Sequence, residues 1–377
     1  MSIDQPCVTP ALEWTMLTVD SYFSADYQGA RLKFRDAATQ ARAALAEFRH
    51  PGRGPSDEVL STDVALFGDT TLPNLAIVAT GLHGVEGLCG SGCLVGLLED
   101  RIVNEWTSDT AVLLVHALNP YGFAHLRRVN EDNVDLNRNF VDHKKPFPKN
   151  DEYRKLHGSL LPEYWEGPSR DAAESALRLY AEANGYDNFI SAVTRGQYEF
   201  ADGLFFGGRS PAFSNSLWRR LLSEYGSQRE RVCVIDIHSG LGPRGYGEIQ
   251  FERGPLDPEY QRAQTWYRGA VTTAENGSSS SAAITGYSAI AVAETLPTAE
   301  RTCVTLEYGT VELEQVLSAL RGDHWLHARA SNDPRLTREI KQNMRDAYYC
   351  DEAAWKRDVA ERAVEVFRWS LHGLSEW

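Results

Sequence analysis

The chain has 377 residues, of which 42% are hydrophobic and 24% charged, so it has the composition of an ordinary globular protein with a sizeable core. Lysine and arginine number 38 against 52 acidic residues, which gives a formal net charge of −14. This balance argues against nucleic acid and anionic membranes as general partners, because both bind clustered basic residues.

The first six residues contain no basic segment followed by an apolar one, so no secretory signal is expected. No uninterrupted apolar stretch is long enough to span a bilayer. The cysteines show no CxxC spacing of the kind found in zinc and redox motifs. We therefore expect a reduced, cytoplasmic protein.

The order of the predicted elements indicates an α/β protein. Residues 11–49 contain one long helical pattern, which Pro51-Gly-Arg-Gly-Pro55 ends. Residues 86–100 predict a helix. Runs rich in valine, isoleucine and leucine predict strands buried on both faces. These runs are residues 75–80, 111–118, 232–237 and 303–306. We expect a three-layer α/β/α fold with a central, mostly parallel (mixed) sheet.

A polar, aromatic-rich insert at about residues 143–213 separates the second and third runs. It includes one helix-like stretch at 170–184, and inserts without strands usually form lids or binding loops. Ser278-Ser-Ser-Ser281 is most simply a flexible loop. From residue 311 the chain looks helical, with the strongest pattern at 351–374. Because no convincing linker is present, residues 1–377 are expected to form a single catalytic domain whose insert shapes the substrate pocket.

Polar residues stand at the exit of each predicted strand. In open α/β sheets, ligands bind outside the carboxyl ends of the strands. We therefore expect these polar groups to converge at one edge of the sheet. In chain order they are His83 and Glu86, the loop 127–140, the segment Asp236-Ile-His238, and Glu307.

His83, Glu86 and His238 are candidate metal ligands. A catalytic zinc takes three protein ligands of these types and keeps one position open, which is the arrangement that hydrolysis requires. Taken alone, His238 is more simply a strand-end histidine that is hydrogen-bonded to backbone. Only beside His83 and Glu86 is a site for one Zn²⁺ favoured.

For two further carboxylates, Asp135 and Glu307, the sequence leaves both a functional and a structural role open. Asp135 could accept the free ring N–H of a ligand histidine, or it could cap a turn or helix. Glu307 lies in an apolar strand, where an uncompensated charge is costly. Facing a cleft, Glu307 could take a proton from an attacking water and pass it to a leaving amine. Its alternative is a salt bridge to an arginine.

The loop 127–140 is dense in groups that bind carboxylates and oxyanions. Arg138 with Asn137 could hold a substrate carboxylate, because arginine presents a planar fork and asparagine adds a neutral donor. Arg128 could stabilise the oxyanion formed when a carbonyl is attacked. A solvated loop with internal Asx turns would explain one or two of these residues but not their number.

Several other patterns are weaker evidence for a functional site. Cys89 and Cys93 lie four apart on a predicted helix, but no second Cys/His pair lies nearby to complete a metal site. Gly240-Leu-Gly-Pro-Arg-Gly245 matches a dinucleotide motif, yet no helix is predicted after it. No GxSxG nucleophile elbow is present. His324 and His327 are interpreted as packing or interface residues.

The motifs of the candidate site are, in chain order, His83-x-x-Glu86, Asn119-Pro-Tyr-Gly122, Arg128-x-Asn130, Val134-Asp-Leu-Asn-Arg-Asn-Phe140, Asp236-x-His238-Ser239 and Glu307. Taken together, they resemble the M14 zinc carboxypeptidase family, and they follow one another in that family's order. The glycine-bearing insert, with Arg195-Gly-Gln-Tyr198 and the segment 202–208, looks like the DUF2817 branch.

The resemblance assigns a role to each matched position. It implies that Glu307 is the general base and acid and that Arg128 stabilises the oxyanion. Tyr287 matches the family's substrate-binding tyrosine only loosely. The predicted helical tail favours the carboxypeptidase-like branch over the aspartoacylase-like branch, which has a β-rich carboxy-terminal domain. The remaining implied roles are zinc ligation by His83, Glu86 and His238, and carboxylate anchoring by Asn137 and Arg138.

The expected function is a zinc-dependent hydrolase that cleaves an amide bond next to a free carboxylate. It would release an amino acid from a small peptide or peptide-like substrate. One alternative is an N-acyl-amino-acid deacylase of the aspartoacylase type. A second alternative is a non-catalytic zinc-binding protein, which is disfavoured because all three ligand positions and the glutamate are present.

Overall fold

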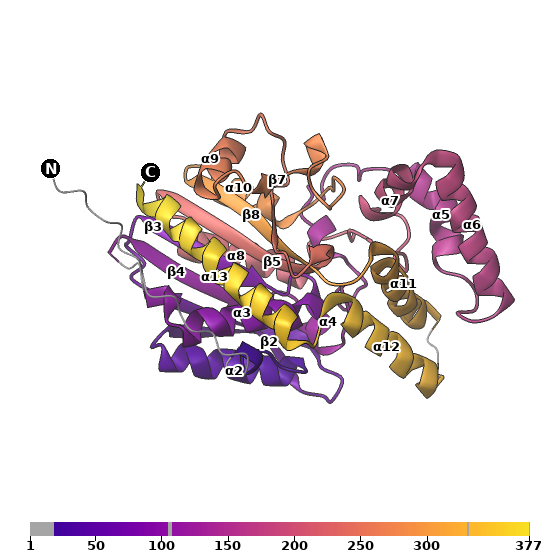
Figure 1. The fold of residues 1–377 in the computed structure, drawn as a ribbon, viewed down its shortest axis with the longest axis horizontal. Coiled ribbons are helices and arrows are strands. Elements are labelled where there is room, and N and C mark those ends of the chain that lie inside the picture. The colour runs from indigo at the N-terminus through magenta and orange to yellow at the C-terminus, as the bar shows by residue number, and fades with distance from the viewer. Residues whose placement is uncertain (1–18, 105–107, 330–331, 377) are drawn as a thin grey trace.

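The computed structural model describes residues 19–104, 108–329 and 332–376 of the chain. This part contains an eight-stranded mixed sheet in the order β1-β2-β4-β3-β5-β8-β6-β7 (Figure 1). The four central strands β4, β3, β5 and β8 run parallel. The strands are β1 (Ala44–Arg53), β2 (Val59–Phe67), β3 (Asn74–Thr80), β4 (Thr110–His116), β5 (Arg231–Arg244), β6 (Glu248–Gln250), β7 (Val271–Thr272) and β8 (Glu300–Gly309).

Helices cover both faces of the sheet. The described helices are α2 (Tyr27–Gln40), α3 (Gly87–Glu99), α4 (Pro120–Ala124), α5 (Asp151–Leu160), α6 (Pro168–Asn184), α7 (Tyr186–Thr194), α8 (Phe213–Gly226), α9 (Pro258–Trp266), α10 (Ser288–Thr295), α11 (Leu313–Arg329), α12 (Pro334–Tyr348) and α13 (Ala353–Glu376). Four short 3-10 helices are η1 (Gly84–Glu86), η2 (Ile102–Asn104), η3 (Leu136–Arg138) and η4 (Ala274–Asn276).

The two faces of β3 illustrate the three layers. Ala76 and Val78 pack in the core that contains α2, α3 and α13, whereas Leu75 and Ile77 pack in the core that contains α8 and α10. Successive side chains of a strand point to opposite faces, so this strand is buried between two helical layers. The predicted three-layer α/β/α fold is confirmed, as are the four predicted apolar strands.

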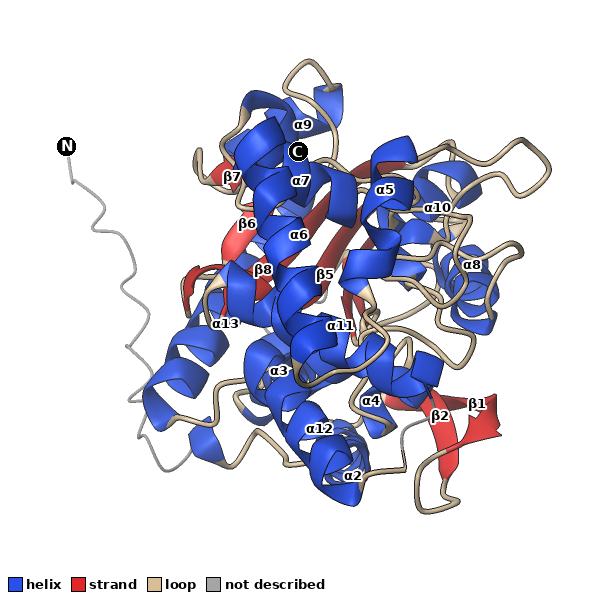
Figure 2. Ribbon diagram, turned by 90° about the vertical axis from the view of Figure 1, so that its right-hand side faces the viewer, coloured by secondary structure: helices blue, strands red, loops and turns tan. Residues whose placement is uncertain are grey.

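A third hydrophobic cluster lies at one end of the sheet. It joins α5, α6 and α7 of the insert to α11 and α12, and it includes Val85 just after β3. Figure 1 shows these helices grouped at the right, and Figure 2 shows them facing the viewer. The expected helix at 170–184 is found as α6, and the expected helical tail is found as α11, α12 and α13.

The predicted helix over residues 11–49 is wrong in its second half. The described helix is α2, and the next residues form β1, which pairs antiparallel with β2. β1 is an edge strand in which exposed residues are interspersed with partly buried ones, so it lacks the apolar run of a buried strand. Pro51 does not end a helix but lies in β1 at a register shift, and edge strands tolerate proline there. Residues 11–18 lie outside the described residues.

β2 was not expected because a carboxylate interrupts its apolar pattern. Asp63 is fully buried in the middle of the strand. Arg31 Nε donates to Asp63 Oδ2 at 2.6 Å, and Arg35 also pairs with this carboxylate. Both arginines lie on α2, so the charge is compensated by residues about thirty positions away. β6 and β7 have only three and two residues, which is too short for a periodic signal.

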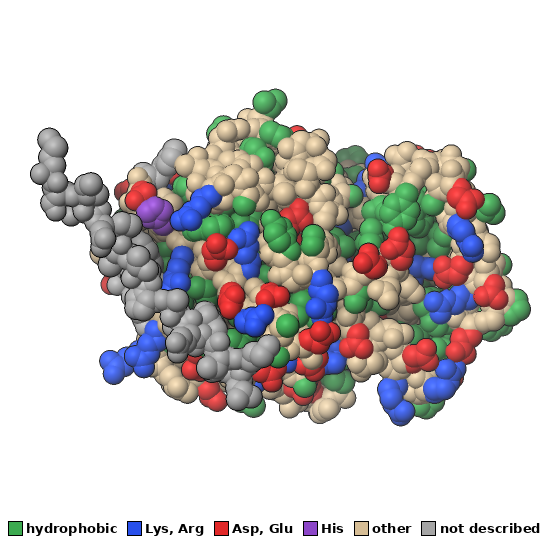
Figure 3. Space-filling model, viewed as in Figure 1, with side chains coloured by type: hydrophobic (Ala, Val, Ile, Leu, Met, Phe, Trp, Pro, Cys, Tyr) green, Lys and Arg blue, Asp and Glu red, His purple; other side chains and the backbone are tan. Residues whose placement is uncertain are grey.

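On the face drawn in Figure 3, acidic and basic side chains of the described residues are interspersed and form no basic patch. Within the described ranges, none of the helices combines the length and the apolar character that crossing a membrane requires.

Candidate metal centre and adjoining pocket

The turn after β3 brings His83 and Glu86 together. The backbone N–H groups of Gly84 and Val85 donate to the carbonyls of Arg128 and Arg127 at 3.1 and 2.8 Å, which fixes the turn against the 127–140 loop. A Cβ atom on Gly84 would lie 2.0 Å from the Gly122 carbonyl carbon, so only glycine fits between these segments.

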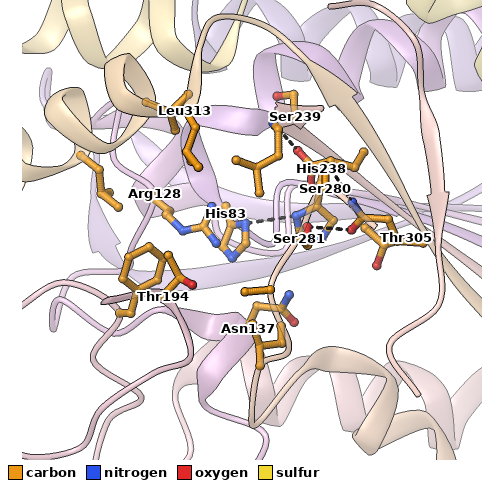
Figure 4. Close-up of a pocket in the computed structure, with 18 of the residues that line it drawn as sticks. His83, Arg128, Asn137, Thr194, His238, Ser239, Ser280, Ser281, Thr305 and Leu313 are labelled. Atoms are coloured by element: carbon orange, nitrogen blue, oxygen red, sulfur yellow. Dashed lines mark hydrogen bonds between the residues drawn. The ribbon is translucent and has the colours of Figure 1, made fainter. Parts of the chain in front are cut away.

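The side chains of His83, Glu86 and His238 converge on one point. His83 Nδ1 lies 3.0 Å from Glu86 Oε1, and His238 Nδ1 lies 2.9 Å from Glu86 Oε2. The two Nδ1 atoms are 3.1 Å apart. All three residues are buried, and their ligand atoms lie within 4.8 Å of one another, so they could hold a metal ion. Figure 4 shows the two histidines facing each other.

Each of the two histidines has a carboxylate close to its outer ring nitrogen, Nε2. His83 Nε2 lies 3.2 Å from Asp135 Oδ1, and His238 Nε2 lies 3.2 Å from Asp236 Oδ2, although the second contact is not aligned as a hydrogen bond. A carboxylate near the outer ring nitrogen favours a proton there, so the inner nitrogen is free to bind a metal. A cation between the two inner nitrogens and Glu86 would take the place of the protons that these nitrogens otherwise share with the carboxylate. This donor set fits zinc, which binds histidine nitrogen and carboxylate oxygen.

The charges of the cluster are mutually compensating. Burial would raise the pKa of Glu86, but the positive charges of His83 and His238 outweigh it and lower this pKa. Burial would lower the pKa of His238, yet Asp236 and Glu86 raise it well above its usual value. The carboxylate is therefore held ionised, which is the form that binds a cation.

Glu307 lies beside this cluster. It is the register partner of His238 between β5 and β8, and its Oε1 accepts a hydrogen bond from the Leu241 N–H at 3.0 Å. Burial and the negative charge of Glu86 raise the pKa of Glu307 to about 8. The salt bridge to an arginine that sequence reasoning left open is not found for Glu307 among the described residues.

Arg128 is held by two carboxylates. Its Nη1 donates to Glu86 Oε1 at 2.8 Å, and its Nε donates to Asp135 Oδ2 at 3.1 Å. Burial would raise the pKa of Asp135, but Arg128 and His83 lower it well below its usual range. Asp135 also caps η3 by accepting the Asn137 N–H at 3.0 Å, so both of the predicted alternatives for this residue are present in one side chain.

Arg138 is buried in the pocket without a carboxylate partner. Its Nε donates to the Thr194 carbonyl at 3.0 Å, and its Nη1 donates to the Asn137 carbonyl at 2.9 Å. No salt bridge to Arg138 is found in the part of the chain that is described. Burial lowers the pKa of Arg138. Asn137 lines the same pocket, and its Oδ1 accepts the Ser288 N–H at 2.9 Å.

These side chains open into a pocket of about 870 Å³. An apolar wall comes from α7 and α11, and a polar end lies on the far side of the histidines. Figure 4 shows Thr194 and Leu313 on one side of His83, and Ser281 and Thr305 on the other. The apolar wall is Ile190, Phe205, Leu313, Val316, Leu317 and Leu320. The polar end is Gln250, Glu252, Ser280, Ser281 and Thr305.

Tyr287 does not line this pocket. It lines a smaller adjoining cavity of about 410 Å³ that also touches Asp236 and Arg253. The tyrosine that does line the main pocket is Tyr348, at the end of α12, close enough for Arg128 to lower the pKa of its hydroxyl against a larger upward effect of burial. A substrate role for Tyr287 stays a prediction.

Sequence reasoning missed the whole polar end of the pocket. Thr305 could have been found, because it lies two residues before Glu307 in a predicted strand and therefore faces the same side. Ser280 and Ser281 were expected only to lie in a flexible loop, yet they line the pocket. For Glu252 and Tyr348 the sequence offered no signal, because neither lies in a motif or at a predicted strand exit.

None of the patterns that were weaker evidence for a site supplies a ligand to the metal cluster, although Leu241 of the segment 240–245 lines the pocket and bonds to Glu307. Cys89 and Cys93 are buried in α3 within the hydrophobic core, and the segment 240–245 ends β5 with no helix after it. His324 Nδ1 bonds to the Leu320 carbonyl at 2.9 Å inside α11, as expected of a packing residue. Arg127, beside Arg128, donates to Asp323 instead of entering the pocket.

The fold and the site together define an α/β protein with a candidate His₂Glu metal centre at the carboxyl ends of its parallel strands. A family model described as "Protein of unknown function (DUF2817)" matches residues 23–362. The chain belongs to this family. No curated protein sequence matches the chain.

Solved structures similar to this chain include hydrolases. The carboxypeptidase A of Helicoverpa armigera is 16% identical, with 94% of this chain and 76% of that chain covered and a TM-score of 0.45. The murein-tripeptide amidase MpaA of Escherichia coli O157 is 15% identical, with 78% and 97% covered and a TM-score of 0.33. The product-bound ectoine utilization protein EutE (DoeB) of Ruegeria pomeroyi is 14% identical, with 81% and 67% covered and a TM-score of 0.37. At such scores these likenesses carry no argument about substrate or mechanism.

Proposed function

We propose that this chain is a zinc-dependent hydrolase that cleaves an amide bond next to a free carboxylate and so releases an amino acid. The observation that carries the proposal is one pocket lined by two of the three convergent ligand side chains, His83 and His238, together with a buried glutamate and a buried arginine that has no salt bridge. In this proposal His83, Glu86 and His238 hold the metal. Zinc bound there supplies a Lewis acid for carbonyl and water oxygens.

Arg138 and Asn137 act as the carboxylate anchor in this proposal. A buried guanidinium whose bonds go only to backbone carbonyls lacks a neutralising charge, and a substrate carboxylate would supply it. Anchoring one end of the substrate also orients the amide for attack, which removes much of the entropy cost of reaction.

Glu307 is the proton carrier, and Arg128 is the oxyanion stabiliser. A carboxylate that lines the pocket directly opposite His238 in the sheet can take up a proton from the attacking water and later release it to the departing amine. Arg128 is fixed by Glu86 and Asp135, so its guanidinium needs no reorganisation when charge develops on the substrate oxygen.

The released amino acid could come from a peptide or from an N-acyl derivative. The pocket wall of leucine, valine and isoleucine side chains from α7 and α11 would accept an apolar acyl group as readily as an apolar residue. The N-acyl-amino-acid deacylase is therefore kept as a second candidate function.

The test compares matched substrates of the zinc-loaded protein. N-acyl dipeptides and N-acyl amino acids with a free carboxylate should be hydrolysed, whereas their carboxy-terminal amides should not. Chelation should stop the reaction, and zinc should restore it. Arg138→Met should raise KM for the free-carboxylate substrates by at least tenfold, since an anchor charge is lost. Equal hydrolysis of acids and amides would contradict the proposal. Faster hydrolysis of the N-acyl dipeptides would favour the carboxypeptidase-like function, and faster hydrolysis of the N-acyl amino acids would favour the deacylase.

A further inference from the structure

The pocket continues past Glu307 along the face of the sheet. Thr305 precedes Glu307 by two residues on β8, so both side chains point into the same space. Gln250 on β6 is the register partner of Thr305. Two residues along a strand correspond to about 7 Å. The polar end therefore lies about one side-chain length beyond the reacting groups.

Most polar groups at this end of the pocket are hydrogen-bonded to one another. Gln250 Nε2 donates to Glu248 Oε2 at 3.1 Å, and the Ser280 N–H donates to Glu248 Oε1 at 3.1 Å. Ser281 Oγ donates to Gln250 Oε1 at 3.1 Å. Glu248 is thus satisfied by neutral donors, and it fixes the serine loop against β6.

Glu252 is different, because its carboxylate is left almost without partners. The contact from Thr305 Oγ1 at 3.4 Å is long for a hydrogen bond. No salt bridge to Glu252 is found among the described residues. The neighbouring Arg253 is occupied by Asp257 at 3.0 Å and by Glu259. An anion that lines a pocket and lacks a cation is a binding group for a positively charged ligand.

We propose that Glu252 selects a released amino acid whose side chain ends in a cation, an ammonium or a guanidinium. This inference depends on the proposed function, in which Arg138 binds the substrate carboxylate. Arg138 and Glu252 line the same pocket, so a ligand with a carboxylate and a cationic side chain satisfies both.

The binding of the carboxylate sharpens this selection. In the free protein, burial raises the pKa of Glu252, and the positive charges of His238 and Arg138 oppose this rise across the pocket. Once a substrate carboxylate neutralises Arg138, Glu252 loses part of that compensation. A neutral side chain would then seal an unpaired anion away from water, which is costly. A cationic side chain removes this penalty.

Lysine and norleucine provide the test, because their side chains differ only in the terminal ammonium. The binding of each free amino acid to the zinc-loaded protein is measured by calorimetry, and hydrolysis is measured with matched N-acyl dipeptides that end in each residue. We expect lysine to be favoured at least tenfold in both Kd and kcat/KM. Glu252→Gln should remove the preference from both directions: lysine should be bound and hydrolysed less well, and norleucine better, because its apolar end no longer covers an unpaired anion. Glu275→Gln, an exposed glutamate outside the pocket, should keep it.

The outcomes distinguish this inference from the proposed function. Hydrolysis without a preference for lysine, or a preference that survives Glu252→Gln, overturns the role of Glu252 and leaves the hydrolase standing. No hydrolysis of any free-carboxylate substrate refutes the hydrolase, and the calorimetric comparison of lysine with norleucine still decides whether Glu252 binds a cation.

Discussion

The two sides of the pocket are built in different ways. The metal side consists of short motifs at the exits of β3, β5 and β8, where adjacent residues such as His83 and Glu86 act together. The rest of the lining is assembled from α7 of the insert, α11 of the tail and the loop residues Ser280 and Ser281, which are far apart in the sequence. The comparison teaches that the candidate metal ligands and Glu307 lie in short local motifs, whereas the residues that line the rest of the pocket are brought together by long-range packing.

The largest expected effect tests the metal side. Glu307→Gln preserves the shape of the side chain but cannot carry a proton, so kcat should fall by about 10²- to 10⁴-fold. Zinc content should be unchanged, because the three candidate ligands are untouched. Steady-state kinetics and metal analysis measure both. Glu312→Gln, at an exposed position, serves as the control and should keep full activity. An unchanged rate in Glu307→Gln would remove the proposed role of Glu307.

The next effect tests the connection between the two sides. Asp323 on α11 accepts from Arg127 Nε at 2.9 Å and from Lys341 Nζ at 2.6 Å. Arg127 in turn holds the turn that carries His83 through the N–H of Val85. Asp323→Asn leaves the buried Arg127 and the partly buried Lys341 without this anion, so the free energy of unfolding should fall by about 3–5 kcal/mol.

Denaturant unfolding at neutral pH measures this loss. The control is Glu339→Gln, which removes an exposed ion pair with Arg335 on α12 and should cost less than about 1 kcal/mol. Similar losses in both variants would show that Asp323 does not join the two sides.

The smallest effect concerns acid stability on the helical side. Burial lowers the pKa of His324 on α11 to about 4. Between pH 6.5 and about 4, His324 binds a proton in the unfolded chain but stays neutral in the folded one. The free energy of unfolding therefore declines as pH falls through this window. The decline from one such group is about 1.4 kcal/mol per pH unit. His324→Asn should flatten this part of the stability profile relative to the unsubstituted protein.

His116 allows the same measurement on the other side of the molecule. It stacks on Phe34 with ring centroids 4.8 Å apart, and burial lowers its pKa to about 4 as well. His116→Asn should therefore flatten the same pH window without touching α11. If neither variant alters the profile between pH 4 and 6.5, buried histidines do not set the acid sensitivity of the fold.

Much of the metal side could be predicted, and the reasons are local. A buried parallel strand is a continuous apolar run, so the exits of β3, β5 and β8 are visible in the sequence. Residues at these exits point to one edge of the sheet, which is why His83, Glu86, His238 and Glu307 could be expected to meet. Their proposed roles as ligands and base stay predictions until metal and activity are measured.

The failures also have physical reasons. β1 looked helical because an edge strand needs no apolar run, and only its pairing with β2 identifies it. The loop 278–281 looked flexible because serine-rich sequence has no pattern, whereas the carboxylate of Glu248, 32 residues away, holds it. Both errors concern segments whose hydrogen-bond partners are distant in the sequence.

The sequence by itself determined the layered fold, the exits of the central strands and the residues that could hold a metal and move a proton, because periodicity and short spacings are local properties. The tertiary structure alone decided that Glu252 and Arg138 share a pocket and that α11 forms its apolar wall. It also decided which buried charges are compensated, as for Arg127 with Asp323, 196 residues apart. Such pairings depend on how the chain folds back on itself, and no local pattern records them.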